Sequence, residues 1–305
     1  MTACELAQVA APDGENVMVV EAVLRVGASR QSVLLHRSID DGAIAGDRGA
    51  DVTITKPDGE EFDFVESHFS DCIIGNPDSW QIDLDVDFAC YRSLPSHGRF
   101  VRPGATYDLH VETADGQVVR GRTTVPEAPE FRTPAVSVDR RDRTAWCALP
   151  NHTFTLTWTR ADGAWSYIIT TEISQWGDEL RAQGVEVPDP LELTGVSVSA
   201  SDTTLVFPRN LGLFQRADHD QRVFAALEDG LPEGSRSVLV VLAADPNYTN
   251  AIRGGRFNPS GNVRFSSVVG DGVGVFGSVV PLVIRSHPSP QGQPLEPCPV
   301  PAPGG

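Results

Sequence analysis

Cysteine is the residue type in this chain whose chemistry is best constrained by its spacing. The sequence holds five cysteines, Cys4, Cys72, Cys90, Cys147 and Cys298. No two are spaced as Cys-x-x-Cys, which excludes zinc-ribbon and thioredoxin-type sites. We predict a disulfide between Cys72 and Cys90, because they flank a segment of strand and turn character and close a loop of suitable length. Cys147 and Cys298 are then left as the second pair.

Cys4 follows two small residues, Thr2 and Ala3, as at the cleavage site of a bacterial lipoprotein signal. The apolar stretch that such a signal needs does not precede it. Either that stretch has been lost, or the start of the chain is misassigned, or Cys4 is a surface thiol. Lipid attachment at Cys4 is therefore one of the alternatives. The other cysteines are even in number, which favours an oxidising compartment, the periplasm or the cell surface.

A glycine-rich run at residues 272–277 fits the pattern GxGxxG. The dinucleotide-binding motif needs a strand before this run, a helix after it and an acid about 20 residues further on. Here a β-type run ending at Pro281 follows, and no acid stands in the right place. The pattern therefore indicates a glycine-rich strand or bulge, and we predict no cofactor.

Three alternating acids, Asp83, Asp85 and Asp87, could open a calcium loop. Such a loop needs glycine at its sixth position and glutamate at its twelfth, where this chain has Phe88 and Leu94. Apolar residues alternate with the acids, so we interpret the segment as an amphipathic strand. A weak surface calcium site is the other interpretation.

The histidines are scattered along the chain. They are His36, His68, His97, His110, His152, His219 and His287. Only His219 has acids on both sides, and we interpret that cluster as solvated. No GxSxG, HExxH or P-loop motif occurs. We predict no catalytic or metal-binding residue and a chain that is not an enzyme, although a site assembled from distant residues stays an alternative.

Composition predicts an all-β chain with room for two domains. In 305 residues there are 28 glycines and 23 prolines, and the apolar runs are short. The net charge is −17, which repels phosphate backbones, so we expect no nucleic-acid partner. Lys56 is the only lysine. No apolar run approaches 18 residues, so we expect no transmembrane helix.

Strand and turn signals place the elements. Residues 51–65 read as a hairpin around the turn Lys56-Pro57-Asp58-Gly59, and residues 107–111 alternate strictly between apolar and polar. Further strands are expected at 153–159 and 165–171, and short helices near 174–183 and 215–228. The resulting division is a leader or tether at 1–16, a sandwich at 17–126, a linker at 127–134, a second sandwich with insertions at 135–285, and a Pro-rich tail at 286–305.

The tail prefers extended polyproline conformation and has almost no apolar side chains. It cannot build a core of its own. We therefore predict that residues 286–305 are a docking strap, held either by the body of the chain or by a partner.

Two stretches resemble strands of fibronectin type III and immunoglobulin-like sandwiches. Residues 156–158, with Asp162-Gly163 and residues 167–169, resemble the B and C strands. Residues 103–111, a Pro-Gly turn followed by a tyrosine and alternating apolar residues, resemble the start of strand F. Residues 231–242 repeat that pattern without the tyrosine. The resemblance implies two such β-sandwich domains in tandem.

Most of residues 4–284 also resemble an uncharacterised family of Gram-negative envelope lipoproteins, a domain of unknown function. The motifs that carry this resemblance are Cys4-Glu5 and residues 19–22, 49–52, 103–126 and 258–277. It implies a membrane-associated protein of the periplasm or cell surface.

Three functions follow as hypotheses. The first is a non-enzymatic structural or interaction subunit that docks on a larger membrane protein complex, such as a transporter, a secretion machine or an energy-converting assembly. The alternative is a ligand-binding surface lipoprotein that delivers glycans or peptides to an outer-membrane receptor. A hydrolase of unrecognised type is the third. Membrane association would come from a lipid anchor or from the partner.

Overall fold

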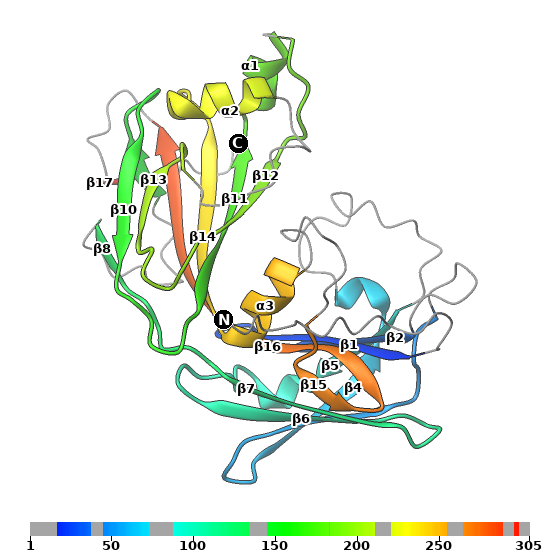
Figure 1. Cartoon of the computed structure of the whole chain (residues 1–305). Helices are drawn as coiled ribbons and strands as arrows, with labels where there is room; N and C mark the ends of the chain where they lie inside the picture. The colour runs from blue at the N-terminus through cyan, green and yellow to red at the C-terminus, as the bar shows by residue number, and fades with distance from the viewer. Residues whose placement is uncertain are drawn as a thin grey trace, which may run out of the picture. The chain divides into compact units, whose positions relative to one another are not determined.

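The computed structural model is built mainly of β-strands (Figure 1). The structure describes residues 17–37, 45–72, 88–133, 145–182, 184–210, 221–254, 265–288 and 296–298. The predicted all-β class is therefore confirmed. Cys4, the acids Asp83, Asp85 and Asp87, and His219 lie outside the described residues.

The chain divides into two compact units, and neither is continuous in sequence. The first comprises residues 1–126 and 245–279, and the second residues 127–244 and 280–305. The chain first passes from one unit to the other after Pro126, where the proline-rich break in the sequence begins. The sequence patterns predict that all of 135–285 forms one domain. Residues 245–279 instead belong to the first unit, because their last strand pairs with the first strand of the chain.

The first unit is one sheet that returns on itself. Its strands are β1 (Met18–Arg25), β2 (Ser32–Arg37), β3 (Asp51–Thr55), β4 (Glu61–Ser67), β5 (Ala89–Ser93), β6 (Thr106–Glu112), β7 (Val118–Thr124), β15 (Val268–Gly270) and the first part of β16 (Gly272–Pro288). Their order is β16-β1-β2-β5-β4-β3-β6-β7-β15. Only Asp271 separates β15 from β16, so the two ends of this path are adjacent in the chain. Helix α3 (Pro246–Gly254) and the 3-10 turns η1 (Phe69–Asp71) and η3 (Pro95–His97) also belong to the described part of this unit.

Alternation along β6 sets the core of the first unit. Tyr107, Leu109 and Val111 are buried, while the polar residues between them face outward, as the period of two predicted. The predicted hairpin is also present: β3 and β4 pair antiparallel with Val52 opposite Phe64.

The GxGxxG run is part of β16, which confirms the glycine-rich strand. β16 pairs parallel with β1, with Met18 opposite Gly272 and Val20 opposite Gly274. A Cβ at Gly274 would lie 2.0 Å from the carbonyl oxygen of Val20, and one at Gly272 would lie 2.7 Å from that of Met18. The glycines are therefore required for the close approach of two backbones.

The second unit contains two sheets. One follows the order β12 (Leu191–Val196), β11 (Ser166–Ser174), β14 (Arg236–Ala244) and the second part of β16, and continues through β9 (Ala145–Ala148) to β17 (Glu296–Cys298). The other has three strands in the order β13 (Thr204–Phe207), β10 (Phe154–Trp158) and β8 (Phe131–Thr133). Both predicted short helices are present, as α1 (Gly177–Ala182) and α2 (Gln221–Glu228).

Large side chains pack between these two sheets. Trp158 of β10 contacts Tyr167 of β11 edge to face, with ring centroids 5.3 Å apart. The Tyr167 hydroxyl accepts a 3.0 Å hydrogen bond from the backbone N–H of Ala161. This bond ties the turn before β11 to the buried end of the ring.

Part of the Pro-rich segment belongs to the second unit. Ser286 to Pro288 continue β16 and pair with β9, which corrects the predicted start of the tail at 286. Glu296–Cys298 forms β17, antiparallel to β9. Its register sets Cys298 opposite Ala145 and Glu296 opposite Cys147. The two cysteines are thus two positions apart on neighbouring strands, and their disulfide stays a prediction.

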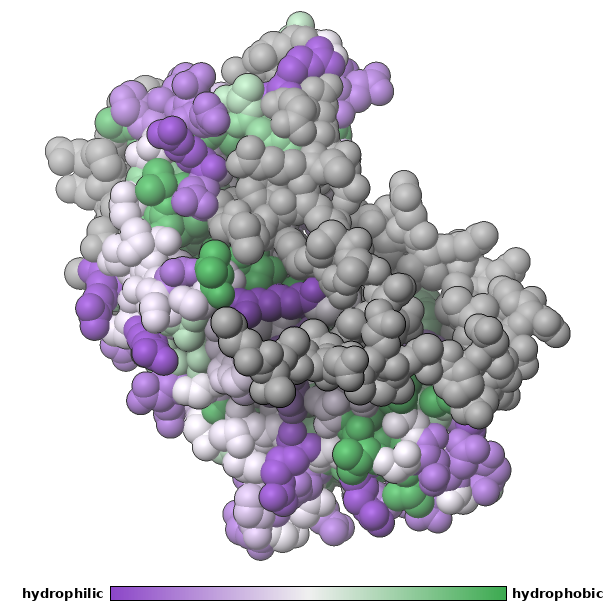
Figure 2. Space-filling model, viewed as in Figure 1, coloured by the Kyte–Doolittle hydropathy of each residue, from purple (hydrophilic) through white to green (hydrophobic). Residues whose placement is uncertain are grey.

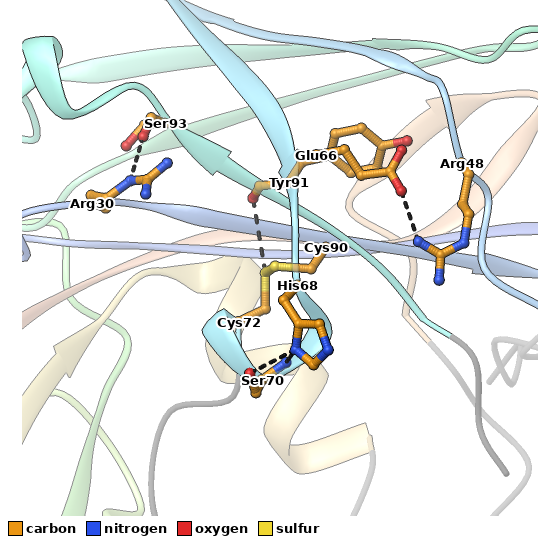
Figure 3. The surroundings of a disulfide bond; sticks show 9 residues. All are labelled: Arg30, Arg48, Glu66, His68, Ser70, Cys72, Cys90, Tyr91 and Ser93. Carbon is orange, nitrogen blue, oxygen red and sulfur yellow. Dashed lines mark hydrogen bonds and ion pairs between the residues drawn. A yellow bond between two sulfur atoms is a disulfide. The ribbon is translucent and has the colours of Figure 1, made fainter. Parts of the chain in front are cut away.

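A disulfide joins Cys72 and Cys90, the pair predicted from the sequence, with Cα atoms 5.9 Å apart (Figure 3). Cys90 lies in β5 and Cys72 directly follows the η1 turn, so the bond attaches that turn to the sheet. Both residues are buried. His68 is the N-cap residue of η1, and its Nδ1 accepts from the N–H of Ser70 at 3.4 Å (Figure 3).

A buried carboxyl begins helix α3. Asp245 is 1% exposed, and its Oδ1 accepts from the N–H of Tyr248 at 2.8 Å, as an N-cap residue does. The Thr123 hydroxyl donates to its Oδ2 at 2.6 Å and lies 2.9 Å from the Ser278 hydroxyl. Burial raises the pKa of Asp245, with hydrogen bonds to the carboxylate opposing it.

Replacing Cys72 and Cys90 together by alanine should lower the free energy of unfolding by about 3 kcal/mol. Without the bond, the unfolded chain regains the conformational entropy that closing the loop between the two cysteines removes. Urea unfolding of the oxidised protein measures the change. Reduced wild type with intact cysteines is the control and should lose a similar amount. An unchanged midpoint in both would contradict the prediction.

Asp245→Asn should remove a pH dependence of stability. The raised pKa means that the folded protein holds this proton more tightly than the unfolded chain. The free energy of unfolding therefore falls as the pH rises from the ordinary value of 3.8 through the raised one. Asparagine keeps the cap without titrating. Urea unfolding across this range should give a flatter profile for Asp245→Asn than for wild type or the exposed control Asp51→Asn; parallel profiles would contradict it.

Candidate functional site: a basic pocket around Lys56

The described residues offer few sites of familiar chemistry. Among them, no three His, Cys, Asp or Glu side chains lie close enough together to hold a metal ion. No helix in this part of the chain is long and apolar enough to cross a membrane. Phe265, Val269 and Val273 of the first unit are exposed. On the face drawn in Figure 2, hydrophobic residues occur in small groups among hydrophilic ones, which is ordinary for a protein surface.

The strongest candidate is a concave site of about 480 Å³ in the first unit. We call it the Lys56 pocket. Its lining includes three cationic side chains, a histidine, one acid, a serine and two aromatic rings. These residues are Lys56, Arg99, Arg102, His97, Glu60, Ser96, Phe62 and Phe100.

The β3–β4 turn places Lys56 and Glu60 beside each other. The N–H of Gly59 donates to the carbonyl of Lys56 at 2.9 Å, and the N–H of Lys56 donates to that of Glu60 at 2.9 Å. Gly59 has a φ of 88°, which only glycine adopts easily, and the Asp58 side chain accepts from the N–H of Glu60 at 3.1 Å. The sequence Lys-Pro-Asp-Gly thus makes a tight reversal, and the side chains of Lys56 and Glu60 form an ion pair across it.

Sheet order brings the other half of the pocket to this turn. Thr55, the last residue of β3, lies opposite Asp108 near the start of β6. At the other side, the N–H of Leu94 donates to the carbonyl of Asp63 in β4 at 3.1 Å. The loop from 94 to 105 therefore starts beside β4 and ends beside β3. It carries His97, Arg99 and Arg102.

Tyr107 fixes the end of that loop. Its buried hydroxyl donates to the carbonyl of Phe100 at 2.9 Å and accepts from the N–H of Arg102 at 3.0 Å. A tyrosine at a strand start that bonds back to the preceding backbone is the tyrosine corner of immunoglobulin-type sandwiches. Burial raises the pKa of Tyr107, and the bond from Arg102 opposes that rise. Tyr107 is thus a positioning residue for the backbone from Phe100 to Arg102.

Two stacked rings form the base of the pocket. Phe62 and Phe100 are 3% and 5% exposed, and their centroids lie 4.0 Å apart. The Lys56 ammonium lies 5.2 Å from the centroid of Phe62, a cation–π contact. His97 meets Phe62 edge to face at 5.4 Å. Lys56 and His97 therefore both pack against the Phe62 ring at the base of the pocket.

Hydrogen bonding determines the role of His97. Its Nε2 accepts from the N–H of Asp63 at 3.1 Å. An acceptor nitrogen carries no hydrogen, so in this arrangement Nδ1 is the N–H donor.

The chemistry of this arrangement is anion binding. The hydrogen bond that the Lys56 ammonium donates to the Glu60 carboxylate raises the pKa of Lys56, so this side chain stays charged. No described acid forms an ion pair with Arg99 or Arg102, which are exposed. The pocket thus collects positive charge on a chain whose net charge is −17. Guanidinium groups bind carboxylate and phosphate in two-point geometry.

The turn that carries Lys56, the only lysine, is predicted from the sequence. No role is predicted for His97, Arg99 or Arg102. A loop some 40 residues further along the chain supplies them, and only the pairing of β3 with β6 and of β4 with β5 brings them to the turn. The local signal was the Pro-Gly-x-x-Tyr pattern, which marks a loop fixed by a tyrosine corner.

Tyr107→Phe should destabilise the chain by about 1–3 kcal/mol, because the Phe100 carbonyl and the Arg102 N–H both lose a buried partner. Thermal or urea unfolding measures this. Tyr167→Phe is the matched control: it should also destabilise, but only Tyr107→Phe should change hydrogen exchange in residues 99–102. Equal exchange in that loop in both variants would contradict the positioning role.

Comparison with known proteins identifies a family without an assigned activity. No curated protein matches the chain. A crystal structure of the FN1–FN3 domains of chicken CNTN1 is 12% identical, with 90% of this chain and 66% of that one covered and a TM-score of 0.19. A crystal structure of DIP-gamma IG1+IG2 is 8% identical, with 88% and 97% covered and a TM-score of 0.20. The family model described as domain of unknown function DUF4249 matches residues 7–222, and the chain belongs to that family.

Proposed function

We propose that this chain is a non-enzymatic interaction protein of the bacterial cell envelope. In this proposal it docks on a larger membrane protein complex, such as a transporter, a secretion machine or an energy-converting assembly. The observation that carries the proposal is the Lys56 pocket, where Lys56, Arg99 and Arg102 converge on a strongly acidic chain.

Charge makes this pocket a distinctive docking surface. A net charge of −17 repels acidic proteins and anionic surfaces from most approaches. A concave basic site reverses the sign of the potential locally and orients an acidic surface of a partner toward itself. The pocket would thus set which face of the chain meets the complex.

Location in the periplasm or at the cell surface fits the disulfide between Cys72 and Cys90, since such bonds persist in oxidising compartments. Membrane association would come from a lipid on Cys4 or from the partner itself.

The alternative function is a surface lipoprotein that delivers glycans or peptides to an outer-membrane receptor. Phe62 and Phe100 stack on each other and are almost fully buried, so their faces are not open to a sugar ring. Within this alternative the pocket therefore favours peptides with acidic groups over neutral glycans.

Replacing Arg99 and Arg102 together by glutamate should reduce co-purification with the membrane complex at least about tenfold, since charge pairs at an interface become repulsive. Affinity capture from native membranes with quantitative mass spectrometry measures it. The control is Arg120→Glu, an exposed arginine of β7 outside the pocket. Equal recovery of partners with all three proteins would overturn docking through this pocket.

A further inference from the structure

We infer that the Lys56 pocket binds a side-chain carboxylate from an acidic protein segment, and that Glu60 is its built-in competitor. The inference rests on the proposed docking function and adds the chemistry of the partner and a regulatory contact. It follows from the asymmetry of the Lys56–Glu60 pair, from Arg99 and Arg102, and from the charge of the whole chain.

The two members of the Lys56–Glu60 pair differ in freedom. The side chain of Lys56 is 22% exposed and lies over the Phe62 ring, whereas that of Glu60 is 55% exposed. Glu60 can therefore swing into solvent at little cost, while Lys56 stays in place. An incoming carboxylate at Lys56 would make the contact that Glu60 makes in the free protein.

Arg99 and Arg102 are cationic groups of the pocket with which Glu60 forms no ion pair; its ion pair is with Lys56. Neither forms an ion pair with a described acid, and Tyr107 holds the backbone at both ends of the segment between Phe100 and Arg102. With Lys56 they give three cationic groups against one resident acid. A carboxylate that displaces Glu60 would therefore gain the guanidinium groups in addition to the lysine.

Carboxylate and phosphate share this recognition chemistry, and the net charge separates their sources. A chain of −17 is repelled by nucleic acid and by anionic lipid surfaces, which carry dense negative charge. A short acidic loop of a protein brings only a few charges and can enter the pocket without facing the rest of the acidic surface. The balance therefore favours an acidic protein segment.

Glu60→Gln is the variant that discriminates. Removing the competitor should tighten binding of an acidic segment about fivefold, the factor that an exposed ion pair supplies. The probe is a synthetic peptide with three consecutive glutamates between Gly-Ser flanks, titrated into the full chain and followed by arginine side-chain NMR. Inorganic phosphate is titrated in parallel. Glu61→Gln removes a charge from the adjacent residue outside the pocket and should leave the affinity close to wild type.

Arg99→Gln with Arg102→Gln should weaken peptide binding about tenfold. Peptide binding that is unaffected by this double variant and by Glu60→Gln would overturn the inference. Phosphate binding as tight as the peptide, with the same response to Glu60→Gln, would overturn the choice of an acidic protein segment. If the membrane capture depends on Arg99 and Arg102 but no peptide binding occurs, the proposed function stands and the carboxylate chemistry fails. If the peptide binds as expected and capture is unchanged, the docking role fails.

Discussion

The parallel pairing of β1 with β16 is the constraint on which the first unit depends. It joins residues 18–25 to residues 272–279, so the unit cannot close before most of the chain is present. A Cβ at Gly274 would lie 2.0 Å from the Val20 carbonyl oxygen, which makes glycine obligatory where the two backbones meet. On the other side, a Cβ at Gly121 of β7 would lie 2.9 Å from that of Phe276. The sheet therefore returns on itself through a seam of glycines, and such non-local closure is slow in folding.

The pocket follows from the order of strands inside that closed sheet. Because β3 lies between β4 and β6, the β3–β4 turn and the loop before β6 reach the same end of the unit. One hydroxyl, that of Tyr107, then fixes the loop against the sheet through two backbone hydrogen bonds. Long cationic side chains lose rotamer entropy when they bind a ligand. Because the loop backbone is already fixed, binding does not have to order the backbone as well.

Local patterns predicted local structure well in this chain. The turn at 56–59 and the alternation at 107–111 depend only on neighbouring residues, and both are present. The sequence does not predict that residues 245–279 belong to the first unit, because neither strand carries a pattern that indicates a parallel partner more than 200 residues away. The pocket was missed for the same reason, since Lys56 and Arg99 share no periodic pattern. The GxGxxG run could be interpreted only by excluding a dinucleotide-binding motif. The glycine pattern alone does not distinguish a close approach of two backbones from a phosphate-binding loop.

The contrast between a net charge of −17 and the basic Lys56 pocket gives the proposed interaction its selectivity. A uniformly acidic surface would repel every acidic partner, and a uniformly basic one would bind many polyanions without distinction. A recess of opposite sign admits only a segment small enough to enter it. In the free protein the Glu60 carboxylate pairs with the Lys56 ammonium and neutralises part of the pocket's positive charge. Weakly binding anions therefore gain little free energy by displacing Glu60. A partner must therefore bring a carboxylate that also reaches the guanidinium groups, which is a requirement of geometry as well as of charge.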